Sequence, residues 1–233
     1  MVTLEVHDLV KTLGTAYSPE GASAVLRGVS FSVSAGECFG LKGATGSGKS
    51  TLLRIIAGLY PPDAGEVRLD GQIVSSPEVM VPPAERNIGF VFQNLGLWPH
   101  LTVAQHLDFV LSATKRSKAQ RISRRQDALE TFALTSLAKR YPAKLSGGER
   151  HLLALARALC ADIALLLLDE PFTGLDGRLK QRILDTLRRE RERRQITTVL
   201  VTHDDEEMRT LCQRIEHLSE GRIIRGATNQ AIS

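Results

Sequence analysis

The stretch Gly43-Ala44-Thr45-Gly46-Ser47-Gly48-Lys49-Ser50-Thr51 decides the fold. It fits the phosphate-binding pattern G-x-x-x-x-G-K-[ST], in which glycines let backbone N–H groups surround phosphate oxygens. A short apolar run precedes it, and a helix is expected from about residue 49 to 57, so that the positive helix end meets the phosphates. Lys49 is expected to reach the β- and γ-phosphates, and Ser50 to offer its hydroxyl to Mg²⁺. We therefore predict that all nine residues bind a nucleoside triphosphate.

Strand and helix patterns alternate around this loop. Residues 2–6 and 29–33 alternate apolar and polar side chains and are predicted to be strands with one covered face. Asp70-Gly71 between two apolar pairs predicts a hairpin. Residues 164–168 and 197–201 are predicted to be strands covered on both faces. This order predicts an α/β fold with a mostly parallel sheet and an N-terminal antiparallel β subdomain.

A helical segment is expected between the two halves of this core. From residue 94 to about residue 146 the β-branched runs vanish, and polar, helix-favouring residues dominate. We therefore predict a single domain. Its catalytic lobe consists of residues 1–93 and 147–233, and its inserted α-helical subdomain spans about residues 94–146.

A second chemical element is Leu165-Leu166-Leu167-Leu168-Asp169-Glu170. A buried strand that ends in two carboxylates delivers them to the carboxyl edge of the sheet, where ligands of such folds bind. Asp169 is suited to holding Mg²⁺ through water, and Glu170 to polarising an attacking water. Strands also end in merely solvated acids, but the nearby phosphate-binding loop favours the catalytic interpretation. Together the two elements predict a nucleoside triphosphatase.

A second anion-binding helix terminus is predicted at Leu145-Ser146-Gly147-Gly148-Glu149. Two glycines follow a serine and open a helix expected over about residues 150–159, whose N-terminus favours negative charge. This stretch begins about a hundred residues after Lys49. A second phosphate-binding end is explained if it serves the nucleotide of another copy. A head-to-tail dimer is therefore expected.

Composition limits the class of protein. The 233 residues carry a formal net charge of +4, with 42% hydrophobic and 24% charged residues, which is the ordinary globular range. Three cysteines far apart in sequence predict reduced thiols rather than a disulfide framework or a zinc site. The start lacks the layout of a signal peptide, and the most apolar stretch, residues 152–168, contains Arg157 and Asp162 and makes a poor membrane span. The small positive excess does not indicate nucleic acid binding.

In its motifs the chain resembles the ATP-binding subunit of an ABC transporter, a P-loop NTPase fold. The similarity runs from Leu4 to about Ile232. The motifs in the family's order are the phosphate-binding loop, Gln93, residues 145–149, residues 165–170, residues 173–176 and His203. Residues 85–93, 97–103 and 201–207 are particularly similar to the subunits of bacterial solute importers.

The resemblance assigns roles to further residues. Gln93 would contact Mg²⁺ or the attacking water, and His203 would contact the γ-phosphate and steady the transition state. Ser146, Gly147 and Gly148 would bind the γ-phosphate of the nucleotide held by the partner copy. The expected catalytic residues are Glu170, His203, Gln93 and Lys49, and the expected metal ligands are Ser50, Gln93 and Asp169.

Other positions carry family features or departures from them. Asp176 would help to organise the dimer seam, and residues 98–103 would lie where the family docks the coupling helices of its membrane subunits. Glu149 replaces a commoner Gln, and Lys42 is an extra cation before the phosphate-binding loop. Leu152 stands where an Arg is frequent, so any bond made by that Arg is absent.

The position that usually stacks on adenine also departs from the family. An aromatic residue is usual in the context K-x-[YFW]-G, whereas Lys11-Thr12-Leu13-Gly14 places Leu13 there. Tyr17, in an expected loop over residues 14–23, is the candidate to take over the stacking. Leu13 is the alternative contact with the adenine.

The resemblance implies a Mg²⁺-dependent ATPase that powers solute transport, with import favoured, as a nucleotide-sandwich dimer. The expected cofactors are ATP and Mg²⁺. The expected partners are a second nucleotide-binding subunit, integral membrane permease subunits and a solute-binding protein, with no nucleic acid. The protein would lie peripherally at the cytoplasmic face of the inner membrane. An ABC exporter subunit and a soluble ABC-type ATPase acting on nucleic acid stay open as alternatives, although the latter proteins usually interrupt or duplicate the core.

Overall fold

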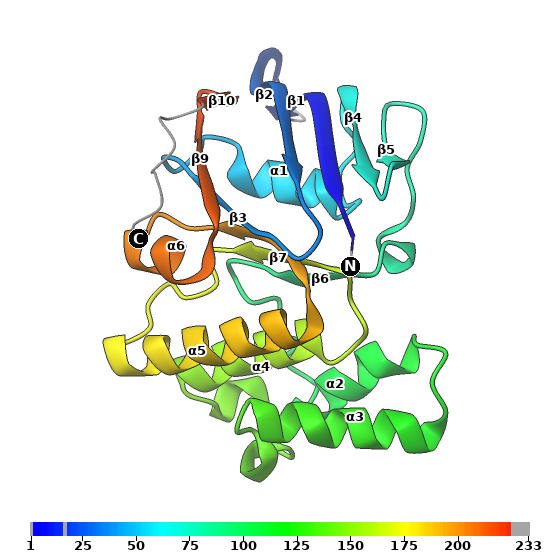
Figure 1. Ribbon diagram of the computed structural model, residues 1–233, viewed down its shortest axis with the longest axis vertical. Helices are drawn as coiled ribbons and strands as arrows, with labels where there is room; N and C mark the ends of the chain where they lie inside the picture. The colour runs from blue at the N-terminus through cyan, green and yellow to red at the C-terminus, as the bar shows by residue number, and fades with distance from the viewer. Residues whose placement is uncertain (1, 16–17, 225–233) are drawn as a thin grey trace.

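The computed structural model describes residues 2–15 and 18–224, and these fold in layers (Figure 1). The first layer is a four-stranded antiparallel sheet in the order β2-β1-β4-β5. Its strands are β1 (Leu4–Thr15), β2 (Ser18–Val33), β4 (Ala64–Leu69) and β5 (Gln72–Ser75). Asp70 and Gly71 join β4 to β5 with positive φ at both residues, which confirms the predicted hairpin.

The second layer is a six-stranded sheet in the order β10-β9-β3-β8-β7-β6. Its strands are β3 (Cys38–Lys42), β6 (Ile88–Val91), β7 (Leu165–Asp169), β8 (Thr197–Val201), β9 (Arg214–Ser219) and β10 (Arg222–Ile224). All neighbours pair in parallel except β10, which is antiparallel to β9. Every residue of β7 and β8 is buried, as predicted for strands covered on both faces.

Helix α1 (Lys49–Ile56) lies between the two sheets (Figure 1). Its apolar residues join side chains of both sheets in one hydrophobic core. The helix ends where Gly58, with φ of +78°, lets the chain turn away, as the sequence predicts. The phosphate-binding loop at the other end of α1 is therefore fixed between two sheets.

Four longer helices cover the opposite face of the parallel sheet (Figure 1). They are α2 (Val103–Ser112), α3 (Lys118–Thr131), α4 (Gly147–Leu159) and α5 (Gly177–Arg194), with 3₁₀ turns η1 (Pro83–Glu85), η2 (Thr135–Leu137) and η3 (Pro142–Lys144). The short α6 (Asp205–Leu211) precedes β9. α2, α3 and α4 each begin with a capping box, because a Ser or Thr cap meets a Gln or Glu three residues later. Their apolar faces form a second core with one face of the sheet.

The hairpin of β1 and β2 is much longer than predicted. We expected strands over 2–6 and 29–33 and a loop over 14–23, but β1 runs to Thr15 and β2 begins at Ser18, so the predicted loop is wrong. Several shifts of register interrupt the pairing of the two strands and hide the alternation of apolar side chains. Lys11 and the backbone N–H of Thr12 both bind Asp63, at 2.7 and 2.6 Å, and fasten this extension to β4.

Two further expectations concern the whole chain. The three cysteines are free, as predicted, and the Sγ atoms of Cys38 and Cys212 lie 3.7 Å apart. Among the helices of the described residues, none combines the length and the hydropathy that a bilayer crossing requires. The fold class predicted from the sequence is confirmed, whereas the division into lobes at residues 93 and 147 stays a prediction.

Candidate active site

The phosphate-binding loop connects β3 to α1 and depends on its glycines. Gly48 caps α1 with a φ of +103°, and a Cβ atom there would lie 2.7 Å from the carbonyl oxygen of Val25. A Cβ atom on Gly43 would meet the carbonyl oxygen of Leu218 in β9. Only glycine fits at these two positions, since β2 and β9 pass directly against the loop.

Lys49 lies inside this loop. Its Nζ atom donates to the carbonyl oxygens of Gly43 and Ala44, both at 2.7 Å. Burial lowers the pKa of Lys49, although Glu170 and Asp169 favour its charged form. The ammonium group therefore has only neutral acceptors in its immediate shell, and a phosphate anion would be a better partner.

Ser50 and Asp169 form a pair suited to Mg²⁺. Ser50 Oγ donates to Asp169 Oδ1 at 3.0 Å, which joins the start of α1 to the end of β7. The carboxyl group of Asp169 is buried, and burial raises its pKa although the hydrogen bond from Ser50 opposes this shift. Mg²⁺ takes oxygen ligands, usually one or two protein oxygens with waters and phosphate. The two side chains fit that requirement.

Glu170 and His203 lie next to each other at the ends of neighbouring strands. His203 Nδ1 is 3.6 Å from Glu170 Oε2, and Thr173 Oγ1 donates to the same carboxylate oxygen at 3.4 Å. The backbone N–H of Glu170 donates to the carbonyl oxygen of Val201 at 2.8 Å. Glu170 adopts a φ of +47°, which is uncommon for a residue with a Cβ atom and common at functional sites. A base and an imidazole are thus available at one point.

These groups converge on one open cavity of about 440 Å³. Its lining residues are Leu13, Val25, Thr45, Gly46, Gly48, Lys49, Ser50, Thr51, Gln93, Glu170 and His203. The four predicted catalytic residues are all among them. Asp169 reaches the cavity through its bond to Ser50, whereas Gly43, Ala44 and Ser47 shape the loop behind it.

The predicted adenine contact is the position where the sequence departs from the pattern of the family that it resembles. Leu13 lines the cavity and is 40% exposed. Tyr17 lies outside the described residues, so its predicted stacking role stays a prediction. Val25, which the sequence analysis missed, lines the cavity from β2. No sequence motif indicates Val25, because this residue reaches the cavity only through the long hairpin of β1 and β2.

The second predicted phosphate-binding end does not line this cavity. Ser146 caps α4, its backbone N–H donates to Glu149 Oε2 at 2.6 Å, and its hydroxyl accepts from the backbone N–H of Glu149. The departure from Gln to Glu at position 149 therefore preserves the cap. Gly147 has open space where a side chain would stand, and Gly148 packs against Leu179. Ser146, Gly147 and Gly148 are thus separate from the cavity that Lys49 and Glu170 of the same chain line.

A network of charges holds α6 beside His203. Lys180 of α5 binds Asp204, which caps α6, and Glu207 at 2.9 Å. Burial opposes the charge on Lys180, but its hydrogen bonds to these two carboxylates outweigh burial and raise the pKa of the lysine. Lys42, expected to be an extra cation, pairs with Asp205. Asp176 caps the same helix α5 that carries Lys180.

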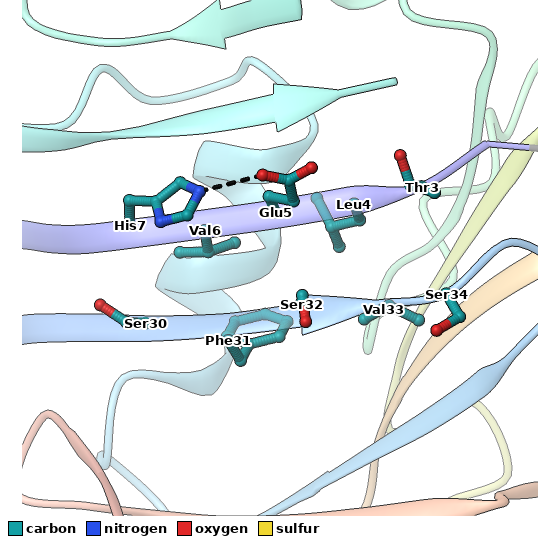
Figure 2. A pocket seen from close by; sticks show the side chains of 10 residues that line it. All are labelled: Thr3, Leu4, Glu5, Val6, His7, Ser30, Phe31, Ser32, Val33 and Ser34. Atoms are coloured by element: carbon teal, nitrogen blue, oxygen red, sulfur yellow. Dashed lines mark hydrogen bonds and ion pairs between the residues drawn. The ribbon is translucent and has the colours of Figure 1, made fainter. Parts of the chain in front are cut away.

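A hollow of about 540 Å³ lies elsewhere, along the first residues of β1 and the last residues of β2. Figure 2 shows its lining, where the Glu5 and His7 side chains lie together, with 3.1 Å between Oε2 and Nε2. None of the predicted site residues lines it. The cavity at the carboxyl ends of β3, β7 and β8 is therefore the candidate active site.

Comparison with known proteins places this chain in a family. Residues 26–173 match the family described as ABC transporter. The chain belongs to the ABC transporter family, as the sequence resemblance predicted.

Among its relatives are ATP-binding proteins of import systems. The sulfate/thiosulfate import ATP-binding protein CysA of Mycolicibacterium paratuberculosis is 44% identical over 93% of this chain and 59% of that protein. A probable sulfate/thiosulfate import ATP-binding protein CysA of Chlorella vulgaris is 40% identical over 91% of this chain and 89% of its own length. This chain thus spans well under two thirds of the Mycolicibacterium relative.

A solved structure agrees with the fold. The ATP-binding cassette MJ0796, in a dimeric post-hydrolysis state with ADP and Pi, superposes with a TM-score of 0.87 and 29% identity. That match covers 98% of this chain and 99% of the cassette. The arrangement of sheets and helices described above is therefore that of an ABC ATPase.

Proposed function

We propose that this protein binds and hydrolyses ATP to power the import of a solute across the cytoplasmic membrane. One observation carries the proposal: Lys49, Ser50 with its hydrogen-bonded partner Asp169, and the Glu170 carboxylate beside the His203 imidazole are gathered around one cavity. Membership of the ABC transporter family and identity with import ATP-binding proteins support the transport role.

Nucleotide binding begins with the loop and with Lys49. The backbone N–H groups of the loop and the N-terminus of α1 receive the phosphates, because the helix end is positive. Lys49 exchanges its bonds to the carbonyls of Gly43 and Ala44 for phosphate oxygens. Ser50, Asp169 and Gln93 are the residues that would hold Mg²⁺. When bound, Mg²⁺ supplies positive charge that neutralises the phosphate oxygens.

Hydrolysis needs a group that accepts a proton from water. Glu170 directly follows β7 and its side chain lines the cavity; Thr173 Oγ1 donates to one carboxylate oxygen, and the His203 ring lies beside the same oxygen. The other oxygen is available to orient and deprotonate the attacking water. His203 lies within reach of the same space and would donate to the γ-phosphate. Catalysis is then mostly positioning and electrostatics, as in phosphoryl transfer generally.

Two copies would complete the site. Ser146, Gly147 and Gly148 offer a helix N-terminus that lies outside the cavity of their own chain. A head-to-tail pair would place this terminus of one copy over the cavity of the other, so that two ATP molecules lie between the subunits. The dimeric cassette MJ0796 supports such an arrangement.

Membrane partners would supply the pathway for the solute. We propose that permease subunits dock at residues 98–103 and that the chain lies peripherally at the cytoplasmic face of the membrane. Trp98 and the 58% exposed Phe109 form an aromatic pair there, with ring centroids 4.8 Å apart. A solute-binding protein would deliver the solute. The names of the relatives favour sulfate or thiosulfate as the solute.

The nucleic acid alternative is less favoured by the charges. Arg116 and Arg124 both pair with Asp162, and Arg125 pairs with Asp108. The basic run over residues 115–125 is therefore partly neutralised, which weakens its field toward a phosphate backbone.

The test of hydrolysis is Glu170→Gln. This change keeps the size of the side chain and removes the base, so ATP binding stays within about three-fold while turnover falls by roughly 10²-fold or more. Glu192→Gln, on the exposed face of α5, is the control and keeps wild-type turnover. Near-normal hydrolysis in Glu170→Gln would rule out its role.

The test of the shared site mixes two inactive variants. Lys49→Ala removes the lysine that would bind phosphate in the cavity of its own chain. Ser146→Arg blocks the helix N-terminus that would bind the nucleotide of the partner copy. Each alone is expected to be inactive. A mixture forms pairs with one intact composite site and regains part of the turnover, whereas a mixture as inactive as its components would contradict the sandwich dimer.

A further inference from the structure

A short loop leads from the cavity to the surface between Gln93 and Trp98. Gln93 lines the cavity, and Trp98 lies five residues further on. Leu95 and Gly96 between them have φ of +61° and +54°. A leucine with positive φ is strained, so contacts from the surrounding structure must hold it there.

Arg157 of α4 makes these contacts. Its side chain is buried, and its guanidinium donates to the carbonyl oxygens of Leu95, at 2.9 Å, and Gly96. Burial lowers the pKa of Arg157. Over the described residues no carboxylate pairs with this guanidinium, so its charge is directed at the two loop carbonyls.

The same guanidinium also touches the far end of the loop. Arg157 Cζ lies 5.2 Å from the centroid of the Trp98 ring, within the range of a cation–π contact. The backbone N–H of Trp98 donates to His106 Nε2 at 3.0 Å, and His106 Nδ1 lies 2.8 Å from the carbonyl oxygen of Thr102. A neutral His106 with its proton on Nδ1 satisfies both partners. Trp98 is thus held between α2 and α4.

The position of Arg157 on α4 gives this contact a functional meaning. α4 begins at the cap Ser146 and at the two glycines that would bind the partner's nucleotide. One rigid helix therefore carries the second phosphate-binding end at its start and the anchor of the Gln93 loop near its end. A shift of α4 would be passed on to Gln93 and Trp98 together.

We propose that Arg157 is a positioning residue that couples α4 to Gln93 and Trp98 through the carbonyls of Leu95 and Gly96. It does not touch the nucleotide. It keeps the strained loop in the one conformation that places Gln93 in the cavity. This inference rests on the proposed ATPase activity for its kinetic consequences but not for its structural ones.

The chain offers a direct spectroscopic reporter and a matched control. Trp98 is the single tryptophan of the sequence, so fluorescence excited selectively at tryptophan, and not at the three tyrosines, reports this loop alone. Arg194 also donates to two backbone carbonyls, those of Leu159 and Ala161, both at 2.6 Å, and burial lowers its pKa as well. Its bonds hold the end of α4 and do not reach the loop.

The experiment compares Arg157→Met, Arg157→Lys and Arg194→Met in the full chain. In wild type and in Arg194→Met, Mg²⁺ and ATP are expected to change the Trp98 fluorescence. In Arg157→Met this response is lost and kcat falls about ten-fold, while the Kd for ATP stays within about three-fold. Arg157→Lys keeps one donor and recovers part of both signals. Arg194→Met loses thermal stability but retains its kcat.

Three results would overturn the proposal: a wild-type Trp98 response in Arg157→Met, a kcat equal in the two methionine variants, or a parallel loss of ATP binding and kcat. If Arg157→Met does not fold, Arg157→Lys takes its place. The same two measurements then test the proposal: the change of Trp98 fluorescence on adding Mg²⁺ and ATP, and the fall of kcat compared with the change in the Kd for ATP. If no variant and no wild-type protein hydrolyses ATP, the proposed function fails. The fluorescence comparison then still tests the coupling.

Discussion

Arg86 is the buried residue on which we expect the stability of the phosphate-binding helix to depend most. It is 4% exposed and lies beneath the C-terminal end of α1. Its guanidinium donates to the carbonyl oxygens of Ile56 at 2.9 Å, Val74 at 2.6 Å and Val81 at 2.8 Å, and to Ser75 Oγ at 2.9 Å. The positive charge of Arg86 also interacts favourably with the negative C-terminal end of the helix dipole of α1.

The cost of Arg86→Met can be worked out from these bonds. Val74 O keeps a bond from the backbone N–H of Val81, whereas Ile56 O and Val81 O have no other donor among the described residues. Each orphaned buried carbonyl costs roughly 1–3 kcal/mol. Burial lowers the pKa of Arg86 to about 10, which shows that the charge is costly to bury. Removing the charge therefore offsets part of the loss in the free energy of unfolding. We expect a net loss of about 3 kcal/mol in the free energy of unfolding.

Urea unfolding followed by circular dichroism measures this loss, with Arg68→Met as the control. Arg68 pairs with Glu66 at the surface of β4, where solvent screens the pair, and its removal is expected to leave the urea midpoint nearly unchanged. Arg86→Lys can satisfy fewer acceptors and should fall between Arg86→Met and wild type. A loss below about 1 kcal/mol in Arg86→Met, with an unchanged urea dependence, would mean that the bonds of Arg86 do not stabilise α1.

Two other predictions concern pH and the adenine contact. The hydrogen bond from Lys180 lowers the pKa of Asp204, so its stabilisation is present above the unfolded carboxyl pKa of about 3.9 and is lost as pH falls through the lower folded value. Asp204→Asn should lower the free energy of unfolding by about 1 kcal/mol at pH 7. The urea midpoint of this variant should also fall less than that of wild type as the pH is lowered. Midpoints that fall in parallel with pH in the two proteins would contradict this prediction. Leu13→Tyr should tighten ATP binding about ten-fold by stacking on the base, as measured by calorimetry. An unchanged Kd would mean that adenine lies away from Leu13.

Much of the site could be predicted because its parts are local. The phosphate-binding loop, the two acids at the end of β7 and the cap of α4 each lie within a few consecutive residues, so the local sequence is enough to predict their geometry. The strand over 197–201 is found at the predicted residues for the same reason, since a fully buried run needs no partner to be recognised.

The parts that could not be predicted depend on contacts between distant segments. Val25 reaches the cavity only through a hairpin whose register shifts conceal its pattern. Arg86 and Arg157 look like ordinary surface residues in the sequence, because nothing nearby reveals that their guanidinium groups bind buried carbonyls. The role of such side chains depends on tertiary contacts, and neither the local sequence nor the composition reveals those contacts.

Strand β7, between β8 and β6, divides its residues between the two cores. Leu165 and Leu167 face the core shared with α1, and Leu166 and Leu168 face the core shared with the helices below the sheet. The first pair supports the loop that would bind phosphate, a group whose geometry does not vary. The second pair supports helices that would meet a membrane partner, and partners differ. Neighbouring leucines of a single strand should therefore change at different rates over evolutionary time, in strict alternation.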